Sequence, residues 1–188
     1  MISVMESDRW DWSTLTCQSL PGERIPGYLE RLLDRDEGER KRAYGVLHCE
    51  VANQGQLYSA AAACVDVLVA WLEGRGRLPA EAVSLMEAIL NARSPGHSVM
   101  VGEAATDVAQ YVRQRVLDGV PLLVSCAENE DLDWFREFCF LVPQLADSSQ
   151  EVIDYLRRSA PLLQGEKRAL CYEALEEAEE VLRDGHMP

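Results

Sequence analysis

The sequence predicts an all-α protein, a compact α-solenoid of helical pairs, with an irregular helical bundle as the alternative. Apolar residues recur with the 3.6-residue period of a helix in nearly every segment, and alternation with period 2 is almost absent. One segment, 58–73, is apolar on almost every side, which requires other helices to cover it. The length of 188 residues fits a single helical-repeat domain over 1–188.

The first half of the chain divides into four expected helices. Pro26 suits the first turn of one helix, and Asp36 suits the N-cap of the next. Asn53-Gln54-Gly55 ends that second helix, because asparagine and glycine accept left-handed backbone angles. Residues 58–73 form the central helix, and Pro79 opens the fourth.

The middle of the chain contains the clearest loop, residues 91–97. A stripe of apolar residues over 101–116 predicts one long helix after this loop, closed by Gly119. The short apolar run 120–124 fits a buried strand by its period alone, but Pro121 favours the start of another helix.

Three further helices are expected toward the C-terminus. An apolar stripe over 132–142 predicts a helix that ends or bends at Pro143. Ser148, followed three residues later by Glu151, predicts a capping box at the start of the next helix. The last helix is expected over 165–183, so that about nine or ten helices joined by short turns result.

Charge and hydropathy restrict the class of partner that the protein can bind and its expected location in the cell. The chain has 18 basic and 32 acidic residues, a formal net charge of −14, and so lacks the basic surplus of a nucleic-acid or anionic-membrane binder. A protein partner with a basic surface is favoured. The apolar run 60–72 contains Asp66 and is shorter than the roughly 20 residues that span a bilayer. The N-terminal stretch shows no signal peptide, so a soluble cytoplasmic protein is expected.

A set of segments in the first half of the chain matches one family pattern. These segments are Trp12-x-x-Leu15, Ile25–Leu33, Arg40–Ala43, Asn53–Ala61 and Val65–Leu72. Over residues 10–73 the chain resembles the HEAT-repeat-like proteins found beside bacterial polymorphic-toxin genes, many of which look like immunity proteins. Gln54, Gly55 and Tyr58 are the most specific part of the pattern. The resemblance implies stacked HEAT-like helical pairs and supplies no catalytic residues.

Motifs that carry chemistry are weak in this chain. Neither of the two common glycine-rich phosphate loops occurs, and Gly74-Arg75-Gly76-Arg77 reads as a turn. His48 and Cys49 are adjacent, but neighbouring residues on a helix point about 100° apart and no second ligand pair has suitable spacing. The sequence therefore indicates a protein that is not an enzyme and needs no cofactor or metal.

The candidate partner-binding residues lie in two acidic clusters of the second half. They are Glu128, Glu130, Asp131 and Asp133 with the neighbouring Trp134, and the helix face Glu173, Glu176, Glu177 and Glu180. Trp134 beside carboxylates has the composition of an interface anchor, with a half-buried covering role as the alternative. Solvated helix faces are the alternative for the carboxylates, and Asp131 can also cap its helix. Trp71 is expected in the core.

These observations lead to one main hypothesis and two alternatives. The chain is expected to be an immunity-type protein that binds and neutralises a toxin domain through its acidic helical surface. Many toxin domains act on nucleic acids and have basic clefts, which an acidic partner can block. A general helical-repeat adaptor or scaffold is the first alternative. A helical-repeat enzyme is the weakest, because action on nucleic acid needs a basic groove.

Overall fold

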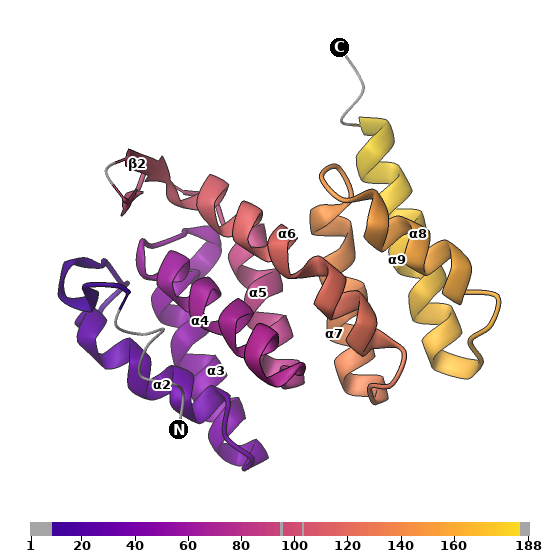
Figure 1. Ribbon diagram of the computed structural model, residues 1–188, viewed down its shortest axis with the longest axis horizontal. Helices are drawn as coiled ribbons and strands as arrows, with labels where there is room; N and C mark the ends of the chain where they lie inside the picture. Colours follow the sequence, from indigo (N-terminus) through magenta and orange to yellow (C-terminus); the bar gives the residue numbers. More distant parts are fainter. Residues whose placement is uncertain (1–8, 95, 103, 185–188) are drawn as a thin grey trace.

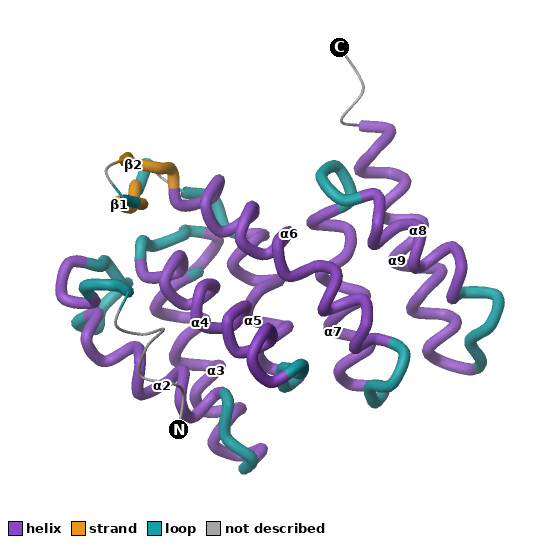
Figure 2. Tube along the Cα trace, in the orientation of Figure 1, coloured by secondary structure: helices purple, strands orange, loops and turns teal. Residues whose placement is uncertain are grey.

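The computed structural model describes residues 9–94, 96–102 and 104–184 (Figure 1). In this part of the chain there are eight α-helices, four short 3-10 helices and one two-stranded hairpin, and helices of both kinds hold 71% of the positions (Figure 2). The prediction of a mostly helical protein is confirmed, with eight α-helices where about nine or ten were expected. Residues 1–8, inspected above for a signal peptide, and Pro95 of the expected loop lie outside the described residues.

The secondary-structure elements follow one another in a simple order. The α-helices are α2 (Ile25–Leu32), α3 (Glu37–Val51), α4 (Ala60–Arg75), α5 (Ala80–Asn91), α6 (Val108–Ala127), α7 (Leu132–Leu141), α8 (Gln150–Ser159) and α9 (Gly165–Asp184). The strands β1 (Ser98–Val101) and β2 (Ala104–Asp107) form an antiparallel hairpin between α5 and α6. Among the described residues, none of the helices has the length and apolar character needed to cross a bilayer.

The helices pack in two rows. Helices α3, α5, α7 and α9 are successive neighbours in one row, and α2, α4, α6 and α8 are successive neighbours in the other. The chain passes from α2 and α3 at one end of the molecule to α8 and α9 at the other (Figure 1). The buried apolar side chains form one continuous cluster along these rows. This arrangement brings the starts of α3, α5 and α7, which are distant in sequence, close to one another.

Helix α4 is the central helix that the sequence predicts. Eleven of its residues are buried, among them Leu68 and the run of four alanines that begins it. Its small side chains let neighbouring helices approach closely. Gly119 of α6 faces Val69 of α4 closely enough that an added Cβ would be in van der Waals contact with Val69 Cγ1, at 3.4 Å.

The region 98–127 differs from its prediction. Val101 lies on β1, and the hairpin turns at Gly102, which has a positive φ of 63°. Helix α6 begins only at Val108 and continues through Gly119 and Pro121, so that Gly119 does not close a helix and Pro121 does not open one. The proline removes one helical hydrogen bond, but the buried residues on either side of it keep this part of α6 packed against the core.

The helix caps are partly as expected. The Asp36 and Asp131 carboxylates accept backbone N–H groups at the starts of α3 and α7, as predicted. The capping box at Ser148 is wrong, because α8 starts one residue later and its N-cap, Ser149, makes no side-chain capping bond. The Ser148 hydroxyl instead donates to Asp147 Oδ1 at 2.8 Å.

Candidate functional site

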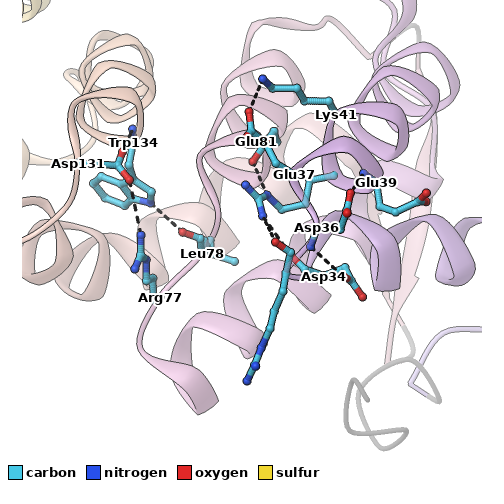
Figure 3. A network of polar contacts seen from close by, with 12 residues as sticks. Asp34, Asp36, Glu37, Glu39, Lys41, Arg77, Leu78, Glu81, Asp131 and Trp134 are labelled. Carbon is cyan, nitrogen blue, oxygen red and sulfur yellow. Dashed lines mark hydrogen bonds and ion pairs between the residues drawn. The ribbon is translucent and has the colours of Figure 1, made fainter.

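A cavity of about 910 Å³ opens where the turns before α3, α5 and α7 lie beside one another (Figure 3). We call it the charged groove. It is lined by Leu33, Asp34, Arg35, Glu37, Arg40, Lys41, Tyr44, Trp71, Arg75, Arg77, Leu78, Pro79, Ala80, Glu81, Ser84, Asp131, Asp133, Trp134, Arg136 and Glu137. Six basic and six acidic side chains therefore face one groove in a protein whose net charge is −14.

The turns that build the charged groove each have a local cause. Asp36 Oδ1 accepts the Glu39 N–H at 2.8 Å before α3, and Asp131 Oδ1 accepts the Trp134 N–H at 3.0 Å before α7. Gly76 ends α4 in the left-handed conformation, with φ of 71°, and Pro79 stands at the N-cap of α5. These breaks leave three polar helix starts at one edge of the molecule.

Ion pairs neutralise most of the basic side chains in the groove. Arg40 Nε lies 2.9 Å from Glu81 Oε2 and so joins α3 to α5. The other pairs are Lys41 with Glu37, Arg77 with Glu130 and Asp131, and Arg136 with Asp133 and Glu166. Several of these residues are drawn in Figure 3, where Arg77 lies beside Asp131 and Trp134. The groove is thus a network of cross-linked turns with few free charges.

Two arginines of the groove have no ion pair with any described residue, Arg35 and Arg75. The Arg75 guanidinium lies over the Trp71 ring, 5.2 Å from its centroid. Trp71 is only half-buried, so its predicted place in the core is wrong. It stands near the end of α4, where the covering helices give way to the groove.

Trp134 is a core residue, and its proposed role as an interface anchor is wrong. Only 1% of Trp134 is exposed, and its indole N–H donates to the Leu78 carbonyl oxygen at 3.0 Å. Its ring stacks on Phe138 with 5.6 Å between centroids. Because Asp131 caps α7, Trp134 occupies the first turn on the inward face and closes the floor of the groove.

Glu130 is also not part of an exposed acidic surface. Its carboxylate is buried, and Oε2 lies 2.8 Å from Arg77 as an ion pair, although the two groups lack hydrogen-bond geometry. Burial raises the pKa of Glu130, and Arg77 opposes the rise. Of this cluster, Glu128, Asp131 and Asp133 remain exposed, and the last two are held by arginines.

The second predicted cluster is exposed as expected. We call Glu173, Glu176, Glu177 and Glu180 the α9 acidic face. None of these four carboxylates forms an ion pair with a described residue, in contrast to Glu179 of the same helix, which lies 2.8 Å from Arg157. The structure does not bring the α9 acidic face into the charged groove.

Two half-buried carboxylates on the row of α5, α7 and α9 were not singled out from the sequence. Burial raises the pKa of Glu87, and so do the charges of Glu137 and Glu177. Burial also raises the pKa of Glu137, while its hydrogen bond with Ser84 lowers it. Negative charge therefore continues from the α9 acidic face toward α5. Their proximity depends on how the helices pack, and no spacing in the sequence indicates it.

Buried carboxylates attach the N-terminal segment to the helices. Asp66, which interrupts the apolar helix α4, accepts from Trp10 Nε1 and the Tyr111 hydroxyl, both at 2.8 Å, and pairs with Arg115. Glu50 accepts the backbone N–H groups of Ser19 and Leu20 and the Ser19 hydroxyl. Burial alone would raise the pKa of Glu50, but these hydrogen bonds hold it below its ordinary value.

The Gln54, Gly55 and Tyr58 motif forms the corner between α3 and α4. Gln54 and Gly55 both have positive φ, 50° and 76°. The Tyr58 N–H donates to the Val51 carbonyl oxygen at 3.0 Å, and the Tyr58 hydroxyl donates to Gln18. The motif thus shapes the backbone at this corner, and the Tyr58 hydroxyl is held by the protein's own groups.

Residues with nucleophilic or metal-binding side chains are dispersed in the part of the chain that the structure describes. No group of three or more histidine, cysteine, aspartate or glutamate side chains there is placed to hold a metal ion. The six cysteines are unpaired. Burial raises the pKa of Cys17 and of Cys171 to about 11, so both remain protonated thiols at neutral pH.

Comparison with known proteins finds no matching family model, no matching curated protein and no matching solved structure.

Proposed function

We propose that this chain is a non-enzymatic, immunity-type protein that binds and neutralises a toxin domain through an acidic helical surface. The α9 acidic face carries this proposal: four exposed carboxylates on one helix have no ion pair with any described residue. Unneutralised charges of one sign on a rigid helix are suited to a partner of the opposite sign. The proposal includes a cytoplasmic protein, a toxin domain with a basic surface as its partner, and no cofactor.

The proposed fold is a compact α-solenoid of four HEAT-like pairs in one domain. The pairs are α2 with α3, α4 with α5, α6 with α7, and α8 with α9. Two observations favour it over an irregular bundle: helices of each row are successive neighbours, and α4 is covered on most sides. A solenoid presents one helix of each pair on a continuous surface, which is where carboxylates from α5, α7 and α9 would meet a partner.

The proposed contact surface differs from the one that the sequence suggested: it omits the buried Glu130 and Trp134 and adds two carboxylates of α5 and α7. It contains the α9 acidic face, the half-buried Glu87 and Glu137, and the exposed Glu128. Asp131 and Asp133 belong to its margin, because arginines already hold both carboxylates. Long-range attraction between unpaired carboxylates and a basic cleft would speed the encounter of the two proteins, which matters for an inhibitor that must act before its target does.

A general helical-repeat adaptor is the second candidate function. The charged groove favours it, because a recess with a tryptophan and two unpaired arginines has the composition of a protein-binding site and is lined by no residue of the α9 acidic face. An adaptor would bind a protein that has no toxic activity.

Co-expression tests the proposed function. The protein encoded beside the gene for this chain is expressed alone and together with the chain, and cell growth and complex formation are measured. Growth arrest that the chain relieves is the expected result. A non-toxic neighbour that still forms a complex would favour the adaptor, and a toxic neighbour that the chain neither binds nor inhibits would contradict the proposal.

A matched pair of variants tests the surface in the same system. Glu176→Lys with Glu180→Lys reverses two charges on the α9 acidic face. Glu23→Lys with Glu30→Lys makes the same change of net charge at exposed positions near α2. Association with the neighbour, measured by surface plasmon resonance at two salt concentrations, should slow only for the α9 pair, and more strongly at low salt. Equal slowing by both pairs would mean that net charge acts without a specific face.

A further inference from the structure

We propose that the charged groove is a binding site for an acidic peptide segment, whose carboxylates pair with Arg35 and Arg75 and whose apolar part lies on Trp71. This groove contains no residue of the α9 acidic face, and it would bind a negatively charged ligand, whereas the α9 acidic face would bind a positively charged one. The inference does not rest on the proposed function, since Arg35, Arg75 and Trp71 have no part in the proposed contact surface and the ligand belongs to another class.

The turn between α4 and α5 gives its two arginines different roles. Gly76 is left-handed, and its N–H donates to the Leu72 carbonyl oxygen at 2.7 Å, so the chain reverses between Arg75 and Arg77. Arg77 reaches the buried carboxylate of Glu130 at 2.8 Å and helps to hold α7. Arg75 turns back over the ring of Trp71 and stays exposed. One arginine of the turn is therefore structural, and the other is available to a ligand.

The charged side chains of the groove differ in whether the described part of the protein gives them a polar partner. Among the carboxylates, Asp34 and Glu137 have no ion pair with a described residue, but Asp34 Oδ1 accepts the Asp36 N–H at 2.9 Å and Glu137 has a hydrogen bond with Ser84. The cations that have partners are Arg40, Lys41, Arg77 and Arg136. Arg35 and Arg75, which come from the turn before α3 and the end of α4, have no ion pair with a described residue. A guanidinium is a planar fork of donors that fits a carboxylate with two parallel hydrogen bonds. The groove thus offers two such forks with no acceptor from the protein opposite them.

The lining of the groove selects a peptide over a polyanion. Asp34, Glu37 and Asp133 are exposed there and would repel the closely spaced phosphates of a nucleic acid. A peptide can place separate carboxylates at the two arginines and leave uncharged atoms elsewhere. Half-buried Trp71 and Tyr44 supply apolar area between the charges. The volume of about 910 Å³ lies within the range of ligand-binding clefts.

The test uses two short blocked peptides that differ only in charge. One has two glutamates that flank a leucine, and the other has glutamines in their place. Binding is followed by NMR titration of the four tryptophan indole N–H signals, with Trp71 assigned from the Trp71→Phe variant. The expected result is a shift of the Trp71 signal by the glutamate peptide and a much smaller shift by the glutamine peptide.

Arginine variants make the test specific for the groove. Arg75→Gln and Arg35→Gln should each raise the dissociation constant about three- to tenfold, since each removes one charge-assisted pair. Arg168→Gln is the matched control, because Arg168 is exposed on α9 outside the groove and has no ion pair with a described residue. Arg75→Lys should fall between the parent and Arg75→Gln, because lysine keeps the charge and loses the fork.

Several outcomes would overturn the proposal. These are the absence of a Trp71 shift at about 1 mM glutamate peptide, equal shifts by the two peptides, and an equal loss of affinity in Arg168→Gln. Displacement of the peptide by an equal concentration of inorganic phosphate, or tighter binding of a single-stranded oligonucleotide, would overturn the choice of an acidic peptide as the ligand.

Discussion

The start of α7 and the exposed side of α9 are both rich in aspartate and glutamate, but they differ in how many of these carboxylates form ion pairs. At the start of α7, Glu130 is buried against Arg77, and Asp133 Oδ1 lies 3.0 Å from Arg136. On the α9 acidic face, no carboxylate pairs with a described residue. The difference comes in part from another segment, since Arg77 approaches α7 from the turn before α5, and in part from Arg136 of α7 itself. The number of acidic residues in a stretch of sequence therefore does not measure the charge that a partner meets.

This comparison divides the carboxylates of the second half into two kinds. Those at the start of α7 hold turns together, so changes there should act mainly on stability. Those on the α9 acidic face are free of such contacts with described residues, so changes there should act mainly on long-range attraction and leave the fold intact. The following predictions test this division, beginning with the largest expected effect.

Two tryptophans at the charged groove should differ strongly in their contribution to stability. Trp134→Ala should lower the free energy of unfolding by about 3–5 kcal/mol, because it leaves a large cavity and removes the donor to the Leu78 carbonyl. Trp71→Ala should lower it by about 1–2 kcal/mol, because Trp71 is only half-buried. Urea denaturation of both variants measures the difference, and an equal or larger loss for Trp71→Ala would contradict the assignment.

The Arg77 and Glu130 pair should show that the acidic start of α7 is structural. Arg77→Ala leaves a buried carboxylate without its counter-ion and should lower the free energy of unfolding by about 1–3 kcal/mol. Adding Glu130→Gln should restore part of that loss, since the uncompensated charge is then gone. Arg136→Ala, at a more exposed pair, should have an effect of about 0.2–1 kcal/mol. If Glu130→Gln worsens Arg77→Ala, the buried charge is not the cause.

The carboxylates between α5, α7 and α9 should give a characteristic pH dependence. The pKa values of Glu87 and Glu137 are raised in the folded protein above the ordinary 4.5, so the folded state holds more protons than the unfolded state between 4.5 and the raised pKa values. Stability from these groups therefore increases as the pH falls from 7 toward 4.5. Glu50 acts in the opposite sense, because its pKa is lowered and its contribution is lost below 4.5.

The variant Glu87→Gln with Glu137→Gln tests this pH dependence. Its Tm should exceed that of the parent at pH 7, and the difference should shrink as the pH approaches 5. Thermal unfolding followed by circular dichroism at both pH values measures the change. A difference that is constant between pH 7 and 5 would show that proton binding by these two residues is not involved.

The sequence predicts the helical class, the central helix and two of the caps because these depend on local patterns. It does not predict the hairpin before α6, since the apolar residues over 101–116 also fit a helical stripe. It assigns the wrong burial to both Trp71 and Trp134. Trp134 was expected to be exposed because carboxylates are its neighbours in sequence, whereas the Asp131 cap turns its side chain inward. The charged groove could not be predicted from the sequence, because its residues come from turns that are distant in sequence. Ion pairs between helices also decide which of its charged side chains are neutralised.

The smallest expected effect is on the free energy of unfolding, which charge reversal should raise on the α9 acidic face and lower at the start of α7. Glu176→Lys places a cation one turn from Glu173 and Glu180, so repulsion between like charges on α9 becomes attraction, and the free energy of unfolding should rise by about 0.3–1 kcal/mol. Asp133→Lys removes the pair with Arg136 and puts a cation at the N-terminus of α7, against the helix dipole. This change should lower the free energy of unfolding by about 0.5–1.5 kcal/mol.

Glu30→Lys on α2 is the control for net charge. Thermal unfolding at low salt and at 1 M salt measures both changes, which should be clearly smaller at 1 M because the screening length then falls to about 3 Å. Changes of the same sign in both regions, or changes that salt does not reduce, would show that the two sets of carboxylates do not differ as proposed.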